Sequence, residues 1–154
     1  MMKIGVISDT HGYFDPKIAT YFSDVEHIIH GGDIGRPEII VQLEQLAPVT
    51  AVLGNNDAGL DFRETEMIRL ADRNFLVHHI VDPREPTGTI HRRIRNDKPD
   101  VIVFGHTHKI HNEVREGILF FNPGYAGKPR FNLPRSIAVL YCDPGDIRAE
   151  FHCL

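Results

Sequence analysis

The chain has 154 residues, a formal charge of −4, and 42% hydrophobic and 25% charged residues. This balance is typical of a globular protein, so it argues against disorder and against the strongly basic surface of a dedicated nucleic-acid binder. The length predicts one domain over residues 1–154, and no apolar run is long enough to cross a bilayer.

The first third of the chain predicts strands that alternate with helices. Short apolar, β-branched runs at 3–8, 27–30 and 49–53 are typical of buried strands. A short helix is expected at 17–22, and a longer one at 37–47, which opens on a proline and repeats apolar residues at helical spacing. Short connections between these elements predict a parallel sheet covered by helices.

The remaining two thirds predict more antiparallel structure. We expect a hairpin from 65–70 and 74–79, a helix at 87–96, a buried strand at 101–104, and two further hairpins, 113–115 with 118–122 and 136–143 with 146–152. A mixed α/β protein with two packed sheets and outer helices accommodates this number of strands.

The cysteine pattern and the N-terminus bear on the compartment. Cys142 and Cys153 form no CxxC pair and are expected to be reduced thiols. The N-terminal segment lacks the charged and apolar regions of a secretory signal. Both features predict a cytoplasmic protein.

Polar residues able to bind a metal follow five of the predicted strands. They are Asp9 and His11, Asp33, the run Asn55-Asn56-Asp57, the pair His78-His79, and His106 with His108. Ligands of open α/β sheets bind outside the carboxyl ends of the strands, so these clusters should share one edge. Each cluster alone is weak, and their ordered recurrence after successive strands carries the inference.

Alternation along an extended chain constrains which of these side chains can act together. Residues i and i+2 point the same way, so Asp9 with His11, and His106 with His108, could each hold one centre. His78 and His79 should diverge, which lets only one of them face the site.

The chemistry of the donors predicts the metal. Carboxylate, amide and imidazole suit Mn, Fe, Zn, Co or Ni better than Cu(I) or an iron–sulfur cluster, and Mn²⁺ is our first expectation. The donors exceed one tetrahedral site and suit two divalent ions that share a carboxylate. Two such ions can clamp the attacking and leaving oxygens of a phosphoryl displacement and lower the pKa of bound water.

Together these segments resemble a known family. SDTHG (8–12), HGGD (30–33), GNND (54–57), HH (78–79) and GHTH (105–108) resemble the signatures of the calcineurin-like metallophosphoesterase superfamily. The tail FNPGYAGKPR (121–130) is similar to that of its small, YfcE-type phosphodiesterase branch. The resemblance implies an α/β fold, a four-layer α-β-β-α sandwich of two mixed sheets flanked by helices.

The resemblance also implies roles for individual residues. The first metal would be held by Asp9, His11, Asp33 and His108, and the second by Asp33, Asn55, His78 and His106, so that Asp33 bridges. A bridging hydroxide would attack phosphorus in line with the leaving oxygen. Asp33, Asn55 and His106 would be the catalytic residues, with Asn55 neutralising charge on the phosphoryl oxygens.

Three departures from the family pattern affect the expected substrate contacts. His79-Ile80 stands where the family often has Gly-His, and Asn56 replaces a histidine often assigned as the general acid. Tyr125 stands where the family has the serine of Asn-Pro-Gly-Ser. Asn56, His79 and Arg36 are the candidate substrate-binding residues.

The favoured function is a metal-dependent hydrolase of a small phosphodiester. One alternative is a non-catalytic interaction module of the same fold, similar to a retromer subunit. A second is a nuclease, which the net acidity disfavours. Exposed apolar patches could also form an interface between copies of the chain.

Overall fold

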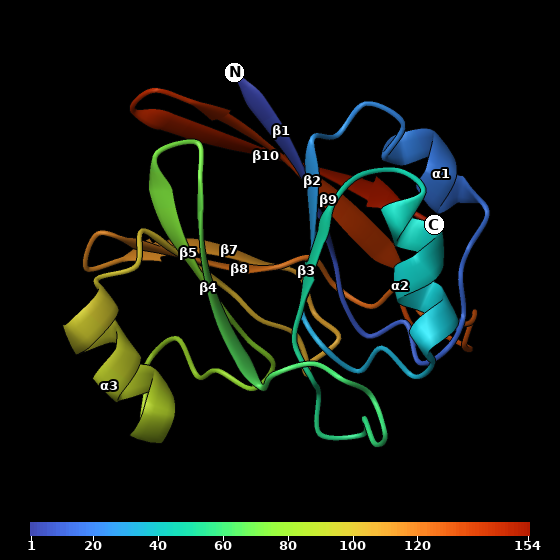
Figure 1. The fold of residues 1–154 in the computed structure, drawn as a ribbon, viewed down its shortest axis with the longest axis horizontal. Coiled ribbons are helices and arrows are strands. Elements are labelled where there is room, and N and C mark those ends of the chain that lie inside the picture. Colours follow the sequence, from blue (N-terminus) through green and yellow to red (C-terminus); the bar gives the residue numbers. More distant parts are fainter.

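The computed structural model describes residues 1–154, which form two five-stranded sheets packed face to face (Figure 1). The first sheet has the order β10-β9-β1-β2-β3 and contains β1 (Met2–Ile7), β2 (His27–His30), β3 (Val49–Ala51), β9 (Ser136–Asp143) and β10 (Asp146–Cys153). The second has the order β4-β5-β6-β8-β7 and contains β4 (Thr65–Leu70), β5 (Arg73–His78), β6 (Val101–Val103), β7 (His111–Arg115) and β8 (Ile118–Asn122).

Each sheet has a parallel centre and antiparallel additions. In the first sheet β1, β2 and β3 are parallel, and the β9–β10 hairpin adds to β1 in antiparallel orientation. In the second sheet β5, β6 and β8 are parallel, whereas β4 and β7 are antiparallel edge strands. The parallel strands of each sheet therefore present their carboxyl ends at one edge.

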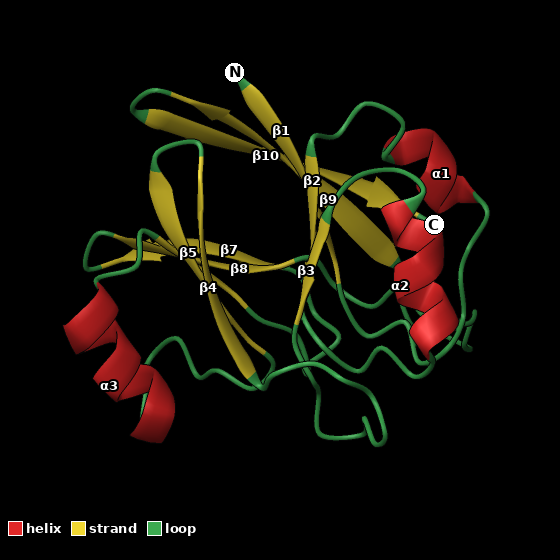
Figure 2. Ribbon diagram, viewed as in Figure 1, coloured by secondary structure: helices red, strands yellow, loops and turns green.

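Three helices complete the layers. The helices α1 (Lys17–Tyr21) and α2 (Pro37–Glu44) cover the outer face of the first sheet, and α3 (Gly88–Asp97) covers that of the second (Figure 2). The four-layer α-β-β-α sandwich expected from the sequence is confirmed. None of the three helices is long and apolar enough to cross a membrane.

Alternation along the strands divides the core into three parts. Ile4 and Val6 of β1 pack between the sheets against Val77 and Val103, while Ile7 packs outward under α1 and α2. This alternation is the sequence period of two that makes a strand two-faced.

The predicted elements are all present, and their limits differ by a few residues. The predicted helix at 37–47 ends at Glu44. Beyond it the backbone N–H groups of Gln45 and Leu46 donate to carbonyls three residues earlier, so the chain leaves the α-helix through a tighter turn. The strand expected at 113–115 begins two residues earlier, at His111.

Candidate metal centre

Loops from both sheets meet at the carboxyl edge of the sandwich. Asp9 follows β1 of the first sheet, whereas His79 and His108 follow β5 and β6 of the second. Asp9 Oδ1 lies 3.4 Å from Nε2 of His108 and 3.8 Å from Nε2 of His79. The centre therefore spans the gap between the sheets.

Asp9 is fully buried, and its two carboxylate oxygens have different surroundings. Oδ2 accepts hydrogen bonds from the hydroxyl of Ser8 (2.7 Å) and the backbone N–H of His106 (3.1 Å). Oδ1 has no hydrogen bond, and Nε2 of His11 lies 3.8 Å from it. One oxygen anchors the side chain, and the other is left for a ligand.

Asp33 is a second buried carboxylate, held by its neighbour in the next loop. Oδ1 accepts the backbone N–H of Asn56 (2.9 Å) and Oδ2 accepts its side-chain amide (3.0 Å). Oδ2 also lies 3.3 Å from Nε2 of His79 and 3.8 Å from that of His11. Burial acts to raise the pKa of Asp33, but these hydrogen bonds and histidines outweigh it and lower the pKa below its usual value.

The structure corrects the expectation that His78 faces the centre, because His79 does. Leu76 of β5 packs outward under α3 and Val77 packs between the sheets. Alternation therefore turns His78 outward, where Nδ1 lies 2.7 Å from Oγ1 of Thr65 on the neighbouring strand. Both residues before the pair are apolar, so the sequence did not indicate which face was inner.

His79 is fixed in the orientation that a metal ligand needs. Its Nδ1–H donates to the carbonyl of Gly31 (2.7 Å), which leaves the lone pair of Nε2 directed toward Asp9 and Asp33. A hydrogen bond on the far nitrogen is how metal-binding histidines are usually oriented. His79 is only 2% exposed, so it belongs to the buried centre rather than to its substrate-facing rim.

Asn55 and His106 lie together at the exposed rim of the centre. Oδ1 of Asn55 is 3.0 Å from Nδ1 of His106, and the His106 ring lies 5.4 Å from the His79 ring between centroids. Both residues thus border the group around His79, whereas the sequence analysis placed them with His78.

The unpartnered atoms of the centre test whether it fits a cation. Asp9 Oδ1, His11 Nε2 and His79 Nε2 are buried and have no hydrogen-bond partner. Two groups of donors lie close enough to share an ion each, Asp9 with His11 and His108, and Asp9 with Asp33 and His79. Carboxylate and neutral imidazole are the donors that divalent transition metals prefer, so the residues fit such ions.

Backbone strain concentrates at the same residues. Asp9, His11, Asp33, His106 and His108 all have positive φ, between 46° and 72°. This left-handed conformation costs a non-glycine residue about 1–2 kcal/mol. Such strain typically persists at functional sites, where surrounding contacts hold it in place.

Two glycines allow the loops to approach this closely. A Cβ on Gly54 would lie 2.0 Å from Asp33 Oδ1, and a Cβ on Gly105 would lie 2.6 Å from Asp9 Oδ2. No side chain fits at either position without displacing a carboxylate.

The other residues expected to contact substrate have structural partners. Asn56 holds the carboxylate of Asp33, as described above, and Nε of Arg36 donates to the carbonyl of Gly12 (3.1 Å). Asp57 accepts the backbone N–H groups of Ile34 (3.1 Å), Gly35 (3.0 Å) and Gly54 (2.9 Å), so it ties two loops together.

Three supporting residues were given no role by the sequence analysis. Ser8 anchors Asp9, and the buried amide of Asn122 donates to the carbonyl of Gly105 (3.1 Å) and to Oγ1 of Thr107 (3.2 Å). The ring of Tyr125 packs beside His108, with 4.7 Å between centroids. All three stand in segments that the sequence analysis singled out, Ser8 in SDTHG and the other two in FNPGYAGKPR, but the sequence did not indicate their contacts.

Burial keeps two histidines of this region neutral. Burial lowers the pKa of His30 to about 3, and its ring accepts the N–H of Gly32 at Nδ1 (3.1 Å) and lies 3.0 Å from Oγ1 of Thr10 at Nε2. Burial also lowers the pKa of His108, against the opposing charge of Asp9. A neutral imidazole is the form that binds a metal.

Comparison with known proteins agrees with this geometry. A family model described as the calcineurin-like phosphoesterase superfamily domain matches residues 2–145. A probable metallophosphoesterase of Methanothermobacter thermautotrophicus is 36% identical over 157 residues, covering 97% of this chain and 91% of the relative.

Solved structures share the fold along the whole chain. A protein described as a novel archaeal phosphodiesterase superposes with a TM-score of 0.76 at 25% identity, covering 98% of this chain and 100% of that chain. Vps29 of Entamoeba histolytica, solved in complex with Zn²⁺, superposes with a TM-score of 0.74 at 22% identity and 99% coverage of both chains. At that lower identity the likeness shows the fold alone. The family match over residues 2–145 and the 36% identical relative establish that the chain belongs to the calcineurin-like phosphoesterase superfamily.

Proposed function

We propose that this protein is a metal-dependent phosphodiesterase that hydrolyses a small phosphodiester at a centre of two divalent cations. The observation that carries the proposal is the convergence of three buried, unpartnered donor atoms, Asp9 Oδ1, His11 Nε2 and His79 Nε2. Without a cation this arrangement leaves polar atoms desolvated and uncompensated, which a folded protein rarely retains.

The side chains divide into two groups. His11 and His108, with Asp9, would hold one ion, and His79, with Asp9 and Asp33, would hold the other. Asp9 belongs to both groups. Oδ2 of Asp33 also lies near Nε2 of both His11 and His79, so Asp33 would be able to bridge the two ions, as the resemblance implies. Asn55 and His106 would add donors at the exposed side, next to His79.

When bound, divalent cations of this type neutralise phosphoryl charge and make water a nucleophile near neutral pH. The chain's own residues contribute orientation: Ser8 and Asn56 fix the two carboxylates, and Gly31 fixes the ring of His79. At the rim, the exposed amide of Asn55 can donate a hydrogen bond to a phosphoryl oxygen, where charge develops during displacement.

The residues around the centre include no evident general acid to protonate the leaving group. Asn56, which follows Asn55, has no titratable proton, and its amide is already engaged with Asp33. A substrate whose leaving group departs without protonation is therefore favoured. An activated aryl phosphodiester meets this requirement, and the likeness to an archaeal phosphodiesterase supports a diester over a monoester.

The two alternatives fit the site less well. An interaction module needs no strained, buried donors, yet five candidate ligands of this chain adopt left-handed backbone conformations. A nuclease would be expected to carry a basic surface, whereas the formal charge of this chain is −4.

The deciding experiment is a metal and substrate screen of the purified protein. Elemental analysis should find close to two transition-metal ions per chain. With Mn²⁺, the protein should hydrolyse bis(4-nitrophenyl) phosphate faster than 4-nitrophenyl phosphate. A chelator should abolish turnover, and Mn²⁺ should restore it better than Zn²⁺. A metal-loaded protein inert toward both esters would contradict the proposal.

A further inference from the structure

The segment that follows β8 carries Tyr125, one of the positions at which this chain departs from the family pattern. Tyr125 is buried, with 1% of its surface exposed, and its ring lies 4.7 Å from that of His108 and 6.1 Å from that of His11 between centroids. Its hydroxyl donates to the carbonyl of Lys128 (2.9 Å). Tyr125 therefore joins the metal-binding histidines to the stretch 127–135, which we call the basic loop.

The basic loop places a cation over the same ring. The guanidinium carbon of Arg130 lies 5.3 Å from the centroid of Tyr125, within the range of a cation–π contact. Tyr125 thus contacts both Arg130 and His108, which places the arginine near the centre.

Two arginines of this loop have different electrostatic surroundings. Arg135 is neutralised, because it pairs with the buried carboxylate of Asp15 (2.9 Å) and donates to the carbonyl of Gly127 (2.7 Å). Arg130 is exposed, and its side chain has no ion pair and no hydrogen bond. Its five N–H donors are available to an anion, and the planar guanidinium suits two oxygens of one phosphate.

We propose that Arg130, held over the ring of Tyr125, is a substrate-binding residue that contacts a non-bridging oxygen of the substrate's phosphoryl group. The inference rests on the function proposed above and deepens it, since it assigns the substrate's anionic oxygen to a residue outside the metal-binding motifs. Such a contact acts on the bound substrate and its transition state alike, so it should affect KM more than kcat.

A binding experiment tests this without depending on turnover. Inorganic phosphate is titrated by calorimetry into the Mn²⁺-loaded wild type and R130Q. Loss of one charge-assisted hydrogen bond should raise the dissociation constant about tenfold in R130Q. The variant R130K keeps the charge but loses the planar guanidinium, so its dissociation constant for phosphate should lie between those of the wild type and R130Q.

The chain supplies a matched control. Arg148 on β10 also lies over a tyrosine, with its guanidinium carbon 4.1 Å from the Tyr141 centroid, but Tyr141 pairs with Lys3 near the start of β1, away from the centre. R148Q should bind phosphate as the wild type does. Y125F, which loses only the hydroxyl that holds Lys128, should weaken phosphate binding while its metal content stays unchanged.

The outcomes separate this inference from the function on which it rests. Three results would each overturn the role of Arg130. The first is a dissociation constant for R130Q within twofold of the wild type, and the second is an equal loss of phosphate affinity in R130Q and R148Q. The third is the absence of phosphate binding by the Mn²⁺-loaded wild type. A wild type that binds phosphate through Arg130 but hydrolyses no phosphoester would support the anion site and overturn the phosphodiesterase.

Discussion

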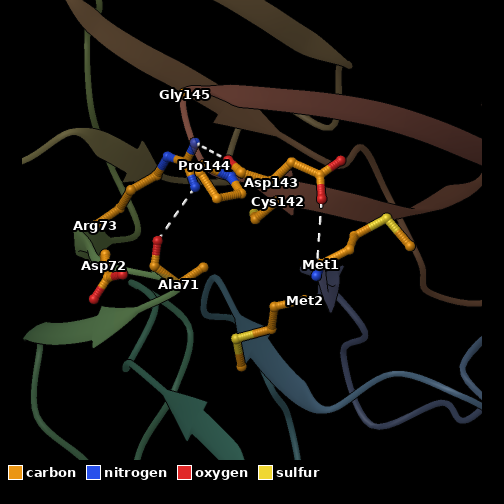
Figure 3. A pocket seen from close by; sticks show the side chains of 9 residues that line it. All are labelled: Met1, Met2, Ala71, Asp72, Arg73, Cys142, Asp143, Pro144 and Gly145. Carbon is orange, nitrogen blue, oxygen red and sulfur yellow. Dashed lines mark hydrogen bonds and ion pairs between the residues drawn. The ribbon is translucent and has the colours of Figure 1, made fainter.

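The two ends of the sandwich differ in whether their polar groups have hydrogen-bond or ion-pair partners. At the end where β1 begins, a cavity of about 570 Å³ lies between two hairpin turns (Figure 3). Several of its polar groups are paired: Arg73 donates to the carbonyls of Ala71, Asp143 and Asp146, and the N-terminal amino group lies 3.8 Å from the carboxylate of Asp143.

At the opposite end, where β1 finishes, a smaller cavity of about 170 Å³ is lined by Gly54, Asn55, His78 and His79. Asp9 Oδ1, His11 Nε2 and His79 Nε2 are buried without hydrogen bonds. Positive φ also occurs at both ends, but near the cavity it belongs to ordinary hairpin turns at Ala71, Asp72 and Gly145. The candidate site is therefore identified by the unpartnered polar atoms and the backbone strain at the carboxyl edge. The size of a cavity does not identify it.

The largest expected effect comes from removing the carboxylate of Asp33, which lies near Nε2 of both His11 and His79. D33N keeps the size of Asp33 but loses the charge that lies between His11 and His79, so metal content should fall and hydrolysis should drop about 100-fold or more. D143N removes a carboxylate at the other end and should leave both unchanged. Activity is measured with Mn²⁺ and bis(4-nitrophenyl) phosphate. Equal activity of D33N and the wild type would show that the carboxyl edge does not differ from the opposite end in its role in hydrolysis.

The neighbouring histidines give the sharpest test of the site geometry. H79Q should lower metal content and reduce hydrolysis by about one to two orders of magnitude, because the inward nitrogen is lost. H78Q should change hydrolysis less than about threefold, since His78 contacts Thr65 outside the centre. A larger loss of hydrolysis in H78Q than in H79Q would support His78 as the metal ligand, as the sequence analysis expected.

Gly54 tests whether close backbone approach matters. In G54A the new Cβ would lie 2.0 Å from Asp33 Oδ1 and 2.2 Å from its backbone nitrogen, so the carboxylate must move. Hydrolysis should fall by about tenfold or more, since small displacements of catalytic groups are costly. G145A, at the cavity end, introduces a left-handed alanine in open space and should lower stability by about 1 kcal/mol without affecting hydrolysis.

Burial of His30 also predicts a pH dependence of stability. The native pKa of His30 is about 3, against 6.5 when unfolded, so only the unfolded chain binds this proton between those values. The free energy of unfolding should therefore decrease as pH falls below 6.5, by up to about 1.4 kcal/mol per pH unit from His30. In urea titrations of the chelated protein, H30Q should show a shallower slope between pH 6 and 4.5. The exposed control H91Q should keep the slope of the wild type, and identical slopes for H30Q and wild type would exclude this contribution.

Much of the candidate site was predictable because its motifs follow strands in order. Once each apolar run ends in a polar cluster, the parallel sheets bring Asp9, Asp33, Asn55, His106 and His108 to one edge. Which of His78 and His79 turns inward was not predictable, because the side of the sandwich on which β5 presents Val77 depends on how the two sheets pack.

The sequence by itself determined the order of strands and helices, the family and the kinds of donor at the strand ends, since these depend on local periodicity and residue chemistry. Only the tertiary structure decided that the ring of His79, rather than that of His78, faces Asp9 and Asp33. It also decided that Tyr125 packs on His108, and that Arg130 remains unpaired while Arg135 does not. These are contacts between segments far apart in the chain, and their geometry follows from the packing of two sheets, which no local pattern encodes.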